Sequence, residues 1–134
     1  MIKYLGSKRR LLPQLTALFG ALPDAHHVLD LFSGTARVGR ALKAAGHQVT
    51  SCDELTFAAT LARCYVQADP AEVTPRVKRA LKELAALPAK PGYFTKTFCE
   101  DARFFQPKNG ARIDAMRDRL DDLDLDEDNR AVVM

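Results

Sequence analysis

The sequence contains no apolar stretch near the roughly 20 residues that a membrane-spanning helix needs. Its opening residues also lack the long apolar segment of a secretory signal. Cysteine is scarce, and Cys52, Cys64 and Cys99 are scattered and form no Cys-x-x-Cys pair. This argues against a disulfide framework and against a structural zinc site. We therefore expect a cytoplasmic protein of ordinary globular composition, with no membrane segment and no metal.

Charge of one sign is not in large excess either, since the net charge is only +3 over 134 residues. That value is too small to indicate a nucleic-acid partner by itself. The charges are unevenly placed, because cations crowd the first ten residues and acids crowd residues 121–128. The acidic end is typical of a solvated turn and helix start. The basic start, with Lys8, Arg9 and Arg10, is consistent with a solvated face or with an anion site.

Residues 28–53 have the pattern of a βαβ unit. Residues 28–32 are a short apolar run before a Ser-Gly turn, which predicts a buried strand. Residues 35–45 carry apolar side chains at helical spacing, and residues 48–52 predict a second strand. Such a unit implies parallel strands joined by a right-handed crossover. Ahead of it, residues 9–20 predict a further helix.

Beyond this unit the pattern is mostly helical. Residues 88–92 contain two prolines and a glycine and mark the clearest break between helices. Residues 93–98 alternate between apolar and polar, which is consistent with a strand or with a loop. The expected helices cover residues 55–68, 72–87, 109–122 and 127 onward.

The fold class that these elements predict is α/β, a partial Rossmann-like fold with one βαβ unit followed by a mostly helical segment. Two parallel strands are fewer than the about five of a typical sheet that is covered on both faces. Either the strand count is wrong, or the chain is a piece of a longer protein.

The turn after the first strand predicts a ligand site. Gly34 follows that strand directly, and Asp53 ends the next strand 19 residues later. In open α/β sheets ligands bind at the carboxyl ends of the strands, where an acid holds ribose hydroxyls. The alternative is that Gly34 only makes a turn and Asp53 only caps a helix. No G-x-G-x-x-G is present, and Arg40 and Ala41 replace the lysine and hydroxyl of a P-loop. A nucleoside without phosphates, of which S-adenosylmethionine is the commonest, fits better.

Several segments resemble one enzyme family. Asp30–Thr35 resembles the Asp-x-Phe-x-Gly cofactor motif of amino-group DNA methyltransferases. Lys3–Gln14 resembles the Tyr/Trp-x-Gly-x-Lys segment that precedes this motif in the adenine-specific, Dam-like class. Residues 92–99 and 104–113 also look like parts of such enzymes. The chain is thus similar over nearly its whole length to the N-terminal part of an adenine-specific, S-adenosylmethionine-dependent DNA methyltransferase.

The resemblance implies a role for each matching residue. A lysine in the first motif would contact the methionine carboxylate, and a tyrosine beside it would line the pocket. The Asp-x-Phe-x-Gly turn would form the floor, with its acid near the cofactor ammonium, and the acid after the second strand would accept the ribose hydroxyls. The implied cofactor-binding residues are Tyr4, Lys8, Asp30, Phe32, Ser33, Gly34, Thr35 and Asp53, with Glu54 as a second choice for the ribose.

One family feature is missing. These enzymes transfer methyl with an Asp-Pro-Pro-Tyr sequence, or with Asn or Ser in its first place, which contacts the flipped base. Asp69-Pro70 is the only Asp-Pro here, and Ala71 follows it. We therefore expect a truncated chain with no catalytic residue, inactive alone. Residues 1–54 would be the cofactor-binding part, and residues 55–134 the truncated start of the DNA-recognition insert.

Other functions stay open. The chain is also consistent with a non-catalytic remnant that binds cofactor or DNA, and with a nicotinamide-dependent or RNA-modifying protein, although the single turn glycine argues against nicotinamide. Double-stranded DNA is the expected partner of the complete enzyme, and exposed edges of an unfinished sheet would favour self-association. Cations of the predicted insert would meet phosphates unless they only form a solvated surface: Lys96, Arg103, Lys108 and Arg112.

Overall fold

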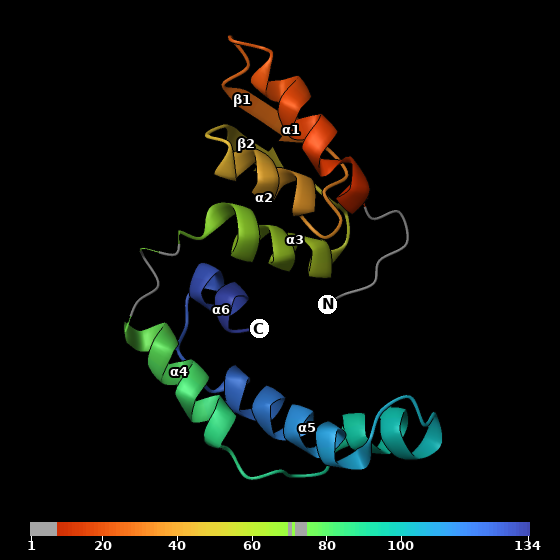
Figure 1. Cartoon of the computed structure of the whole chain (residues 1–134). Coiled ribbons are helices and arrows are strands. Elements are labelled where there is room, and N and C mark those ends of the chain that lie inside the picture. The colour runs from red at the N-terminus through yellow and green to blue at the C-terminus, as the bar shows by residue number, and fades with distance from the viewer. Residues whose placement is uncertain (1–7, 70, 72–74) are drawn as a thin grey trace. The chain divides into compact units, whose positions relative to one another are not determined.

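The computed structural model describes residues 8–69, 71 and 75–134, which form two compact units (Figure 1). Unit 1 contains the described residues up to 71 together with Glu127–Val132, and unit 2 contains residues 75–126. The functional boundary predicted after residue 54 lies inside unit 1. Tyr4, predicted to line the cofactor pocket, lies outside the described residues. None of the helices in the described ranges is long and apolar enough to cross a membrane.

Unit 1 is built on a two-stranded parallel sheet, as the βαβ pattern predicted. A short 3-10 turn leads into the first helix, and the helix after β2 continues as a π-helical turn. The elements are η1 (Lys8–Leu11), α1 (Leu12–Gly20), β1 (His27–Asp30), α2 (Arg37–Ala44), β2 (Gln48–Ser51), α3 (Thr56–Ala62), η2 (Arg63–Gln67) and α6 (Glu127–Val133).

The prediction of a buried first strand over residues 28–32 was wrong in two respects. β1 ends at Asp30, and Leu31 and Phe32 belong to the turn that follows. Only Val28 is buried, whereas Leu29 is 57% exposed. The reason is that side chains alternate between the two faces of a strand. Helix α2 packs against this sheet, with its Gly39 close to the side chains of Val49 and Ser51. An apolar run in the sequence does not reveal which face is covered in this way.

Helix α3 and its extension η2 are held from two sides within unit 1. The ammonium of Lys43 on α2 donates hydrogen bonds to the carbonyls of Val66 (2.6 Å) and Ala68 (2.8 Å) at the end of η2. On α6, Glu127 forms an ion pair with Arg63. Its neighbour Asp128 accepts a hydrogen bond from Gln67 (2.8 Å). Segments separated by some sixty residues of sequence therefore form one unit.

Unit 2 consists of helices α4 (Pro75–Ala86) and α5 (Pro107–Asp121) and the π-helical segment η4 (Thr95–Asp101). The break predicted over residues 88–92 is confirmed, since these residues are not helical. The strand or loop predicted for residues 93–98 was wrong, because this segment is helical. Helix α5 packs against both neighbours, and the Arg119 guanidinium pairs with Glu83 of α4.

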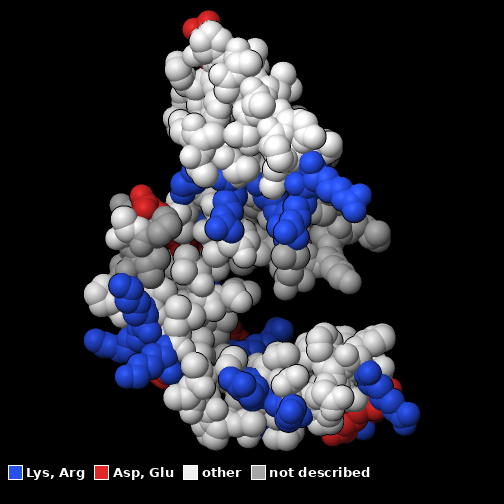
Figure 2. Space-filling view, viewed as in Figure 1, with Lys and Arg blue, Asp and Glu red and all other residues white. Residues whose placement is uncertain are grey.

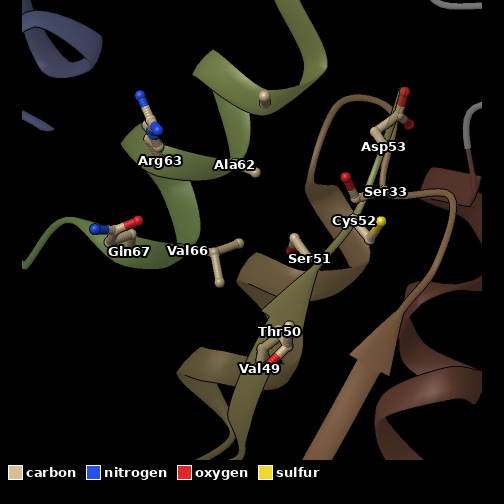
Figure 3. Close-up of a pocket in the computed structure, with 11 residues that line it drawn as sticks. Ser33, Val49, Thr50, Ser51, Cys52, Asp53, Ala62, Arg63, Val66 and Gln67 are labelled. Atoms are coloured by element: carbon tan, nitrogen blue, oxygen red, sulfur yellow. The ribbon is translucent and has the colours of Figure 1, made fainter. Parts of the chain in front are cut away.

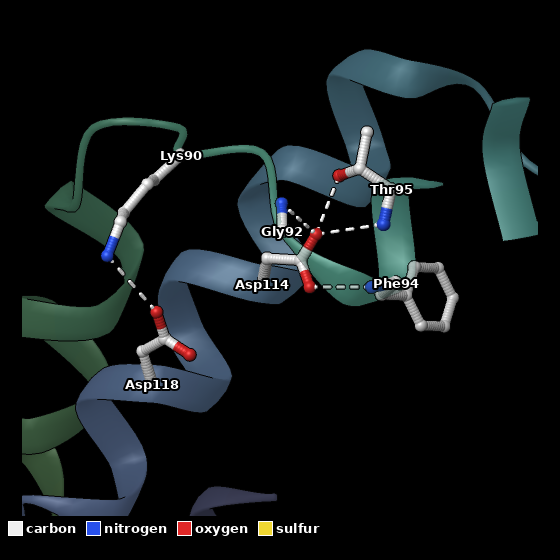
Figure 4. A network of polar contacts seen from close by, with 6 residues as sticks. All are labelled: Lys90, Gly92, Phe94, Thr95, Asp114 and Asp118. Carbon is white, nitrogen blue, oxygen red and sulfur yellow. Dashed lines mark hydrogen bonds and ion pairs between the residues drawn. The ribbon is translucent and has the colours of Figure 1, made fainter. Parts of the chain in front are cut away.

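The carboxylate of Asp114 caps the N-terminal end of the η4 helix. Asp114 of α5 is buried and accepts hydrogen bonds from the N–H groups of Gly92, Phe94 and Thr95, each 2.8 Å long (Figure 4). The Thr95 hydroxyl donates a further bond of 2.6 Å. N–H groups at the start of a helix have no partner within the helix, and here one side chain from another helix satisfies them. The alternating sequence of residues 93–98 is thereby stabilised as a helix.

Candidate functional site

The two turns that follow β1 and β2 are joined by hydrogen bonds. The N–H of Gly34 donates to Oδ2 of Asp53 (2.7 Å), and the N–H of Ser33 donates to the carbonyl of Cys52 (3.1 Å). Gly34 has a φ of 50°, a left-handed conformation that glycine adopts without steric cost. The structure therefore brings together the two residues that the sequence placed 19 positions apart.

The Asp53 carboxylate is held in its ionised form. Its pKa is lowered by the N–H of Leu55, which donates to Oδ1 (3.0 Å), and by the N–H of Gly34. A carboxylate has about four lone-pair positions, of which these two bonds occupy two. Asp53 therefore keeps acceptor capacity for hydroxyl groups of a ligand at neutral pH.

Three buried polar atoms lie without a hydrogen-bond partner within the described part of the chain: Oδ2 of Asp30, Oγ of Ser33 and Oγ of Ser51. Asp30 and Ser51 are register partners at the carboxyl ends of the two strands. Ser33 follows in the turn that Asp53 holds. Buried polar groups nearly always have a partner, so this set has the donor and acceptor pattern of a site for a polar ligand.

A groove opens beside Ser33, Ser51 and Asp53, between β2 on one side and α3 with η2 on the other (Figure 3), whereas Asp30 is not part of its lining. Its volume is about 500 Å³, within the roughly 300–1,000 Å³ of small-molecule sites. Polar side chains of Ser33, Ser51 and Asp53 stand along its strand side, and those of Arg63 and Gln67 stand on the helical wall. Its apolar lining is Val49, Ala59, Ala62 and Val66.

The other residues implied for the cofactor are dispersed. Thr35 is buried in the turn, whereas Phe32 is 81% exposed and does not line the groove. Lys8 and Glu54 are exposed and also lie outside the groove lining. Sequence reasoning missed Ser51, whose only signal was a small polar residue near the end of the second strand.

The four cations predicted to meet DNA all lie in unit 2 and are exposed. The ammonium of Lys96 is paired with Asp101 (3.0 Å) and Glu100 (3.4 Å). These contacts, chiefly the hydrogen bond to Asp101, raise its pKa. Its charge is thus balanced locally, whereas Arg103, Lys108 and Arg112 have no carboxylate partner in the described residues.

Exposed aromatic side chains accompany these cations, and sequence reasoning missed them. Tyr93 is 75% exposed and Phe104 is 76% exposed. In the same segment Phe94 packs against Phe98 and Phe105, with ring centroids 4.9 and 5.3 Å apart. Unit 2 therefore presents exposed aromatic rings in the same stretch of sequence as its exposed cations.

Fold and site together define an α/β protein with a groove beside its parallel strands. A sequence model of the D12 class N6 adenine-specific DNA methyltransferases matches residues 4–133. The chain belongs to this family, which confirms the resemblance of its motifs. A curated relative, the Type II methyltransferase M.NlaIII of Neisseria lactamica, is 28% identical over 129 residues. The match covers 90% of this chain and 38% of that protein, so the chain spans well under half the relative's length. No solved structure matched the chain.

Proposed function

We propose that unit 1 is the S-adenosylmethionine-binding part of a DNA adenine methyltransferase. The observation that carries this proposal is the set of unpartnered buried polar atoms on Asp30, Ser33 and Ser51, beside the ionised carboxylate of Asp53. A nucleoside ligand with an amino-acid tail offers both hydroxyl and ammonium donors to such a set. Membership of the methyltransferase family makes S-adenosylmethionine the ligand of choice. When bound, it supplies the methyl group.

Each residue of the site has a role in this proposal. Asp53 accepts the ribose hydroxyls with the lone pairs that its two backbone donors leave free. Asp30 receives the ammonium of the methionine end, which satisfies its buried oxygen. Ser33, Gly34 and Thr35 form the floor of the methionine end. Lys8 contacts the methionine carboxylate. The roles of Tyr4, Phe32 and Glu54 remain predictions of the family resemblance.

Replacing Asp53 with alanine is expected to weaken binding of S-adenosylmethionine at least about tenfold. The variant loses the ribose acceptor and leaves the Gly34 N–H without its partner. Isothermal titration calorimetry on the full chain measures the change. Asp24→Ala removes an exposed carboxylate in the turn before β1 and is the matched control. An unchanged Kd for Asp53→Ala, or an equal loss for Asp24→Ala, contradicts the site assignment.

We propose further that this chain alone binds the cofactor without transferring methyl. The sequence contains no Asp-Pro-Pro-Tyr, and a base that reacts must be held by such a group outside the duplex. Incorporation of tritiated methyl into DNA by the chain alone is therefore expected to stay at background, although calorimetry detects the cofactor. Robust incorporation overturns this part of the proposal. A protein that binds cofactor or DNA without any catalysis is the second candidate, favoured by the same missing sequence.

DNA contacts in this proposal come from unit 2. Arg103, Lys108 and Arg112 are exposed cations without carboxylate partners in the described ranges, and they meet phosphates. Lys96 contributes less, because two carboxylates already surround its ammonium. Double-stranded DNA is the proposed partner. Within the range 55–134 predicted for the start of the recognition insert, residues 75–126 of unit 2 are the part that we propose carries these contacts.

A further inference from the structure

The positive charge of this protein comes from its first part. Residues 1–52 contain seven Lys or Arg and only two acids, Asp24 and Asp30. The remaining residues contain thirteen Lys or Arg and fifteen Asp or Glu. The net charge of the whole chain therefore hides a strongly basic segment. Apart from Lys8, proposed to contact the cofactor, and Lys43, which bonds to carbonyls of η2, its cations have no role in the proposed site.

The fold gathers these cations on one side of unit 1. Arg37 and Arg40 are three residues apart on α2, a spacing that places them side by side on a helix. The turn η1 packs against α2 and carries three adjacent exposed cations. Figure 2 shows Lys and Arg side chains as a band over this part of unit 1. We call this surface the basic face, formed by Arg9, Arg10, Arg37 and Arg40.

Neither acid of the same segment forms an ion pair with Arg10, Arg37 or Arg40 in the described residues. Asp24 lies in the turn before β1, at the amino end of the strands, whereas α2 begins after their carboxyl ends. Asp30 has a buried carboxylate oxygen. Among the described residues, neither Arg10 nor Arg37 has an ion-pair partner. The Arg40 guanidinium stands 5.2 Å from the ring centroid of Tyr65, which leaves its charge unbalanced by a carboxylate.

We propose that the basic face binds the phosphate backbone of duplex DNA through contacts that do not depend on sequence. This inference rests on the proposed function, which makes DNA the substrate, and it adds a contact surface on the cofactor-binding unit. Guanidinium groups bind phosphate oxygens in pairs, and neutralising phosphates releases bound counterions. Arg37 follows Gly34 by three residues, so the basic face adjoins the turn of the proposed cofactor site.

The test is duplex binding by the full chain and by Arg37→Gln/Arg40→Gln, measured by fluorescence anisotropy with a short labelled duplex at several salt concentrations. The double variant is expected to bind roughly tenfold more weakly or worse. The slope of log affinity against log salt should fall by about 2, because each phosphate contact contributes about 0.9. The loss should be equal for unrelated duplex sequences, since phosphate contacts carry no sequence information.

Two variants separate this effect from loss of folding or of net charge. Arg37→Lys/Arg40→Lys keeps both charges and is expected to retain most of the affinity. Arg79→Gln/Lys82→Gln removes two exposed cations at the same spacing on α4, which are not among the insert cations proposed to meet phosphates. It should change binding less than about threefold. An unchanged salt slope for Arg37→Gln/Arg40→Gln, an equal loss in the α4 variant, or tighter binding of single-stranded RNA than of duplex DNA overturns the proposal.

The outcomes also distinguish this inference from the proposed function. If calorimetry shows binding of S-adenosylmethionine but the wild-type chain binds no duplex, the basic face is not a DNA-binding surface. The assignment of the cofactor site is then still supported. If the duplex binds through Arg37 and Arg40 but no cofactor is detected, the cofactor assignment fails and the basic face stands.

Discussion

Replacement of Asp114 with alanine is expected to lower the free energy of unfolding of unit 2 by at least about 3 kcal/mol. The side chain accepts four hydrogen bonds, three of them from backbone N–H groups of Gly92, Phe94 and Thr95. A bond to a charged acceptor contributes about 1.5–3 kcal/mol, and a buried donor left alone costs a similar amount. A unit of this size has only a few kcal/mol of stability. We therefore expect loss of helix, measured by far-UV circular dichroism during urea unfolding.

The same helix supplies the matched control. Asp118 lies one turn further along α5 and pairs with Lys90 at 3.4 Å, with 65% of its side chain exposed (Figure 4). An exposed ion pair of this kind contributes little, so Asp118→Ala should change stability by less than about 1 kcal/mol. If both variants unfold at the same urea concentration, the Asp114 hydrogen bonds do not hold unit 2 together.

The pH dependence of stability provides a second measurement of the contribution of Asp114. Burial raises the pKa of this carboxyl, but the hydrogen bonds from Thr95, Phe94 and Gly92 outweigh burial and lower its pKa from 3.8 to about 2. The folded-state pKa lies below that of the unfolded chain. The stabilisation is therefore fully present above about pH 4 and is lost as the pH falls from about 4 towards 2. Asp114→Asn should remove this part of the pH dependence.

The second large effect is expected at Gly110, where α5 lies closest to η4. A Cβ atom here would overlap the Sγ of Cys99 and lie 3.1 Å from the Cα of Thr95. Alanine favours a helix by about 1 kcal/mol over glycine, but overlap with a buried neighbour costs about 1–3 kcal/mol or more. Because Cys99 is buried and the Thr95 contact is backbone, we expect Gly110→Ala to lower the stability of unit 2 by about 2 kcal/mol, measured by thermal unfolding.

A rescue experiment isolates the cause. Cys99→Ala removes the overlapping sulfur, so Cys99→Ala/Gly110→Ala should regain part of the stability that Gly110→Ala loses. Gly20→Ala is the control, since no atom lies within 4 Å of the Cβ position at Gly20. Additive losses in the double variant would show that the overlap with Cys99 is not what destabilises Gly110→Ala.

The part of the fold that could be predicted from sequence is the part governed by local pattern. The periodicity of apolar residues, together with the turn residues, predicted the parallel pair of strands and the helix between them. The spacing of Gly34 and Asp53 predicted that the two would lie together, because the carboxyl ends of adjacent parallel strands meet at one edge. Their roles in cofactor binding stay predictions.

The features of the fold that could not be predicted from sequence depend on contacts between residues far apart in the chain. The helix over residues 95–101 exists because Asp114, about twenty positions away, satisfies its first N–H groups. No local pattern signals such a partner, and alternation alone favoured a strand or loop. Likewise, the apolar character of Leu29 and Phe32 did not reveal that both are exposed, because coverage of a sheet face is set by other elements.

The return of α6 to unit 1 determines how unit 2 is joined to the rest of the chain. The chain leaves unit 1 after η2 and re-enters it at Glu127, which pairs with Arg63, so unit 2 is an insertion whose two ends are anchored in one host. The entropy lost on closing a loop increases only slowly with the length of that loop. Changes in the length or surface of unit 2 are therefore expected to leave the groove of unit 1 intact.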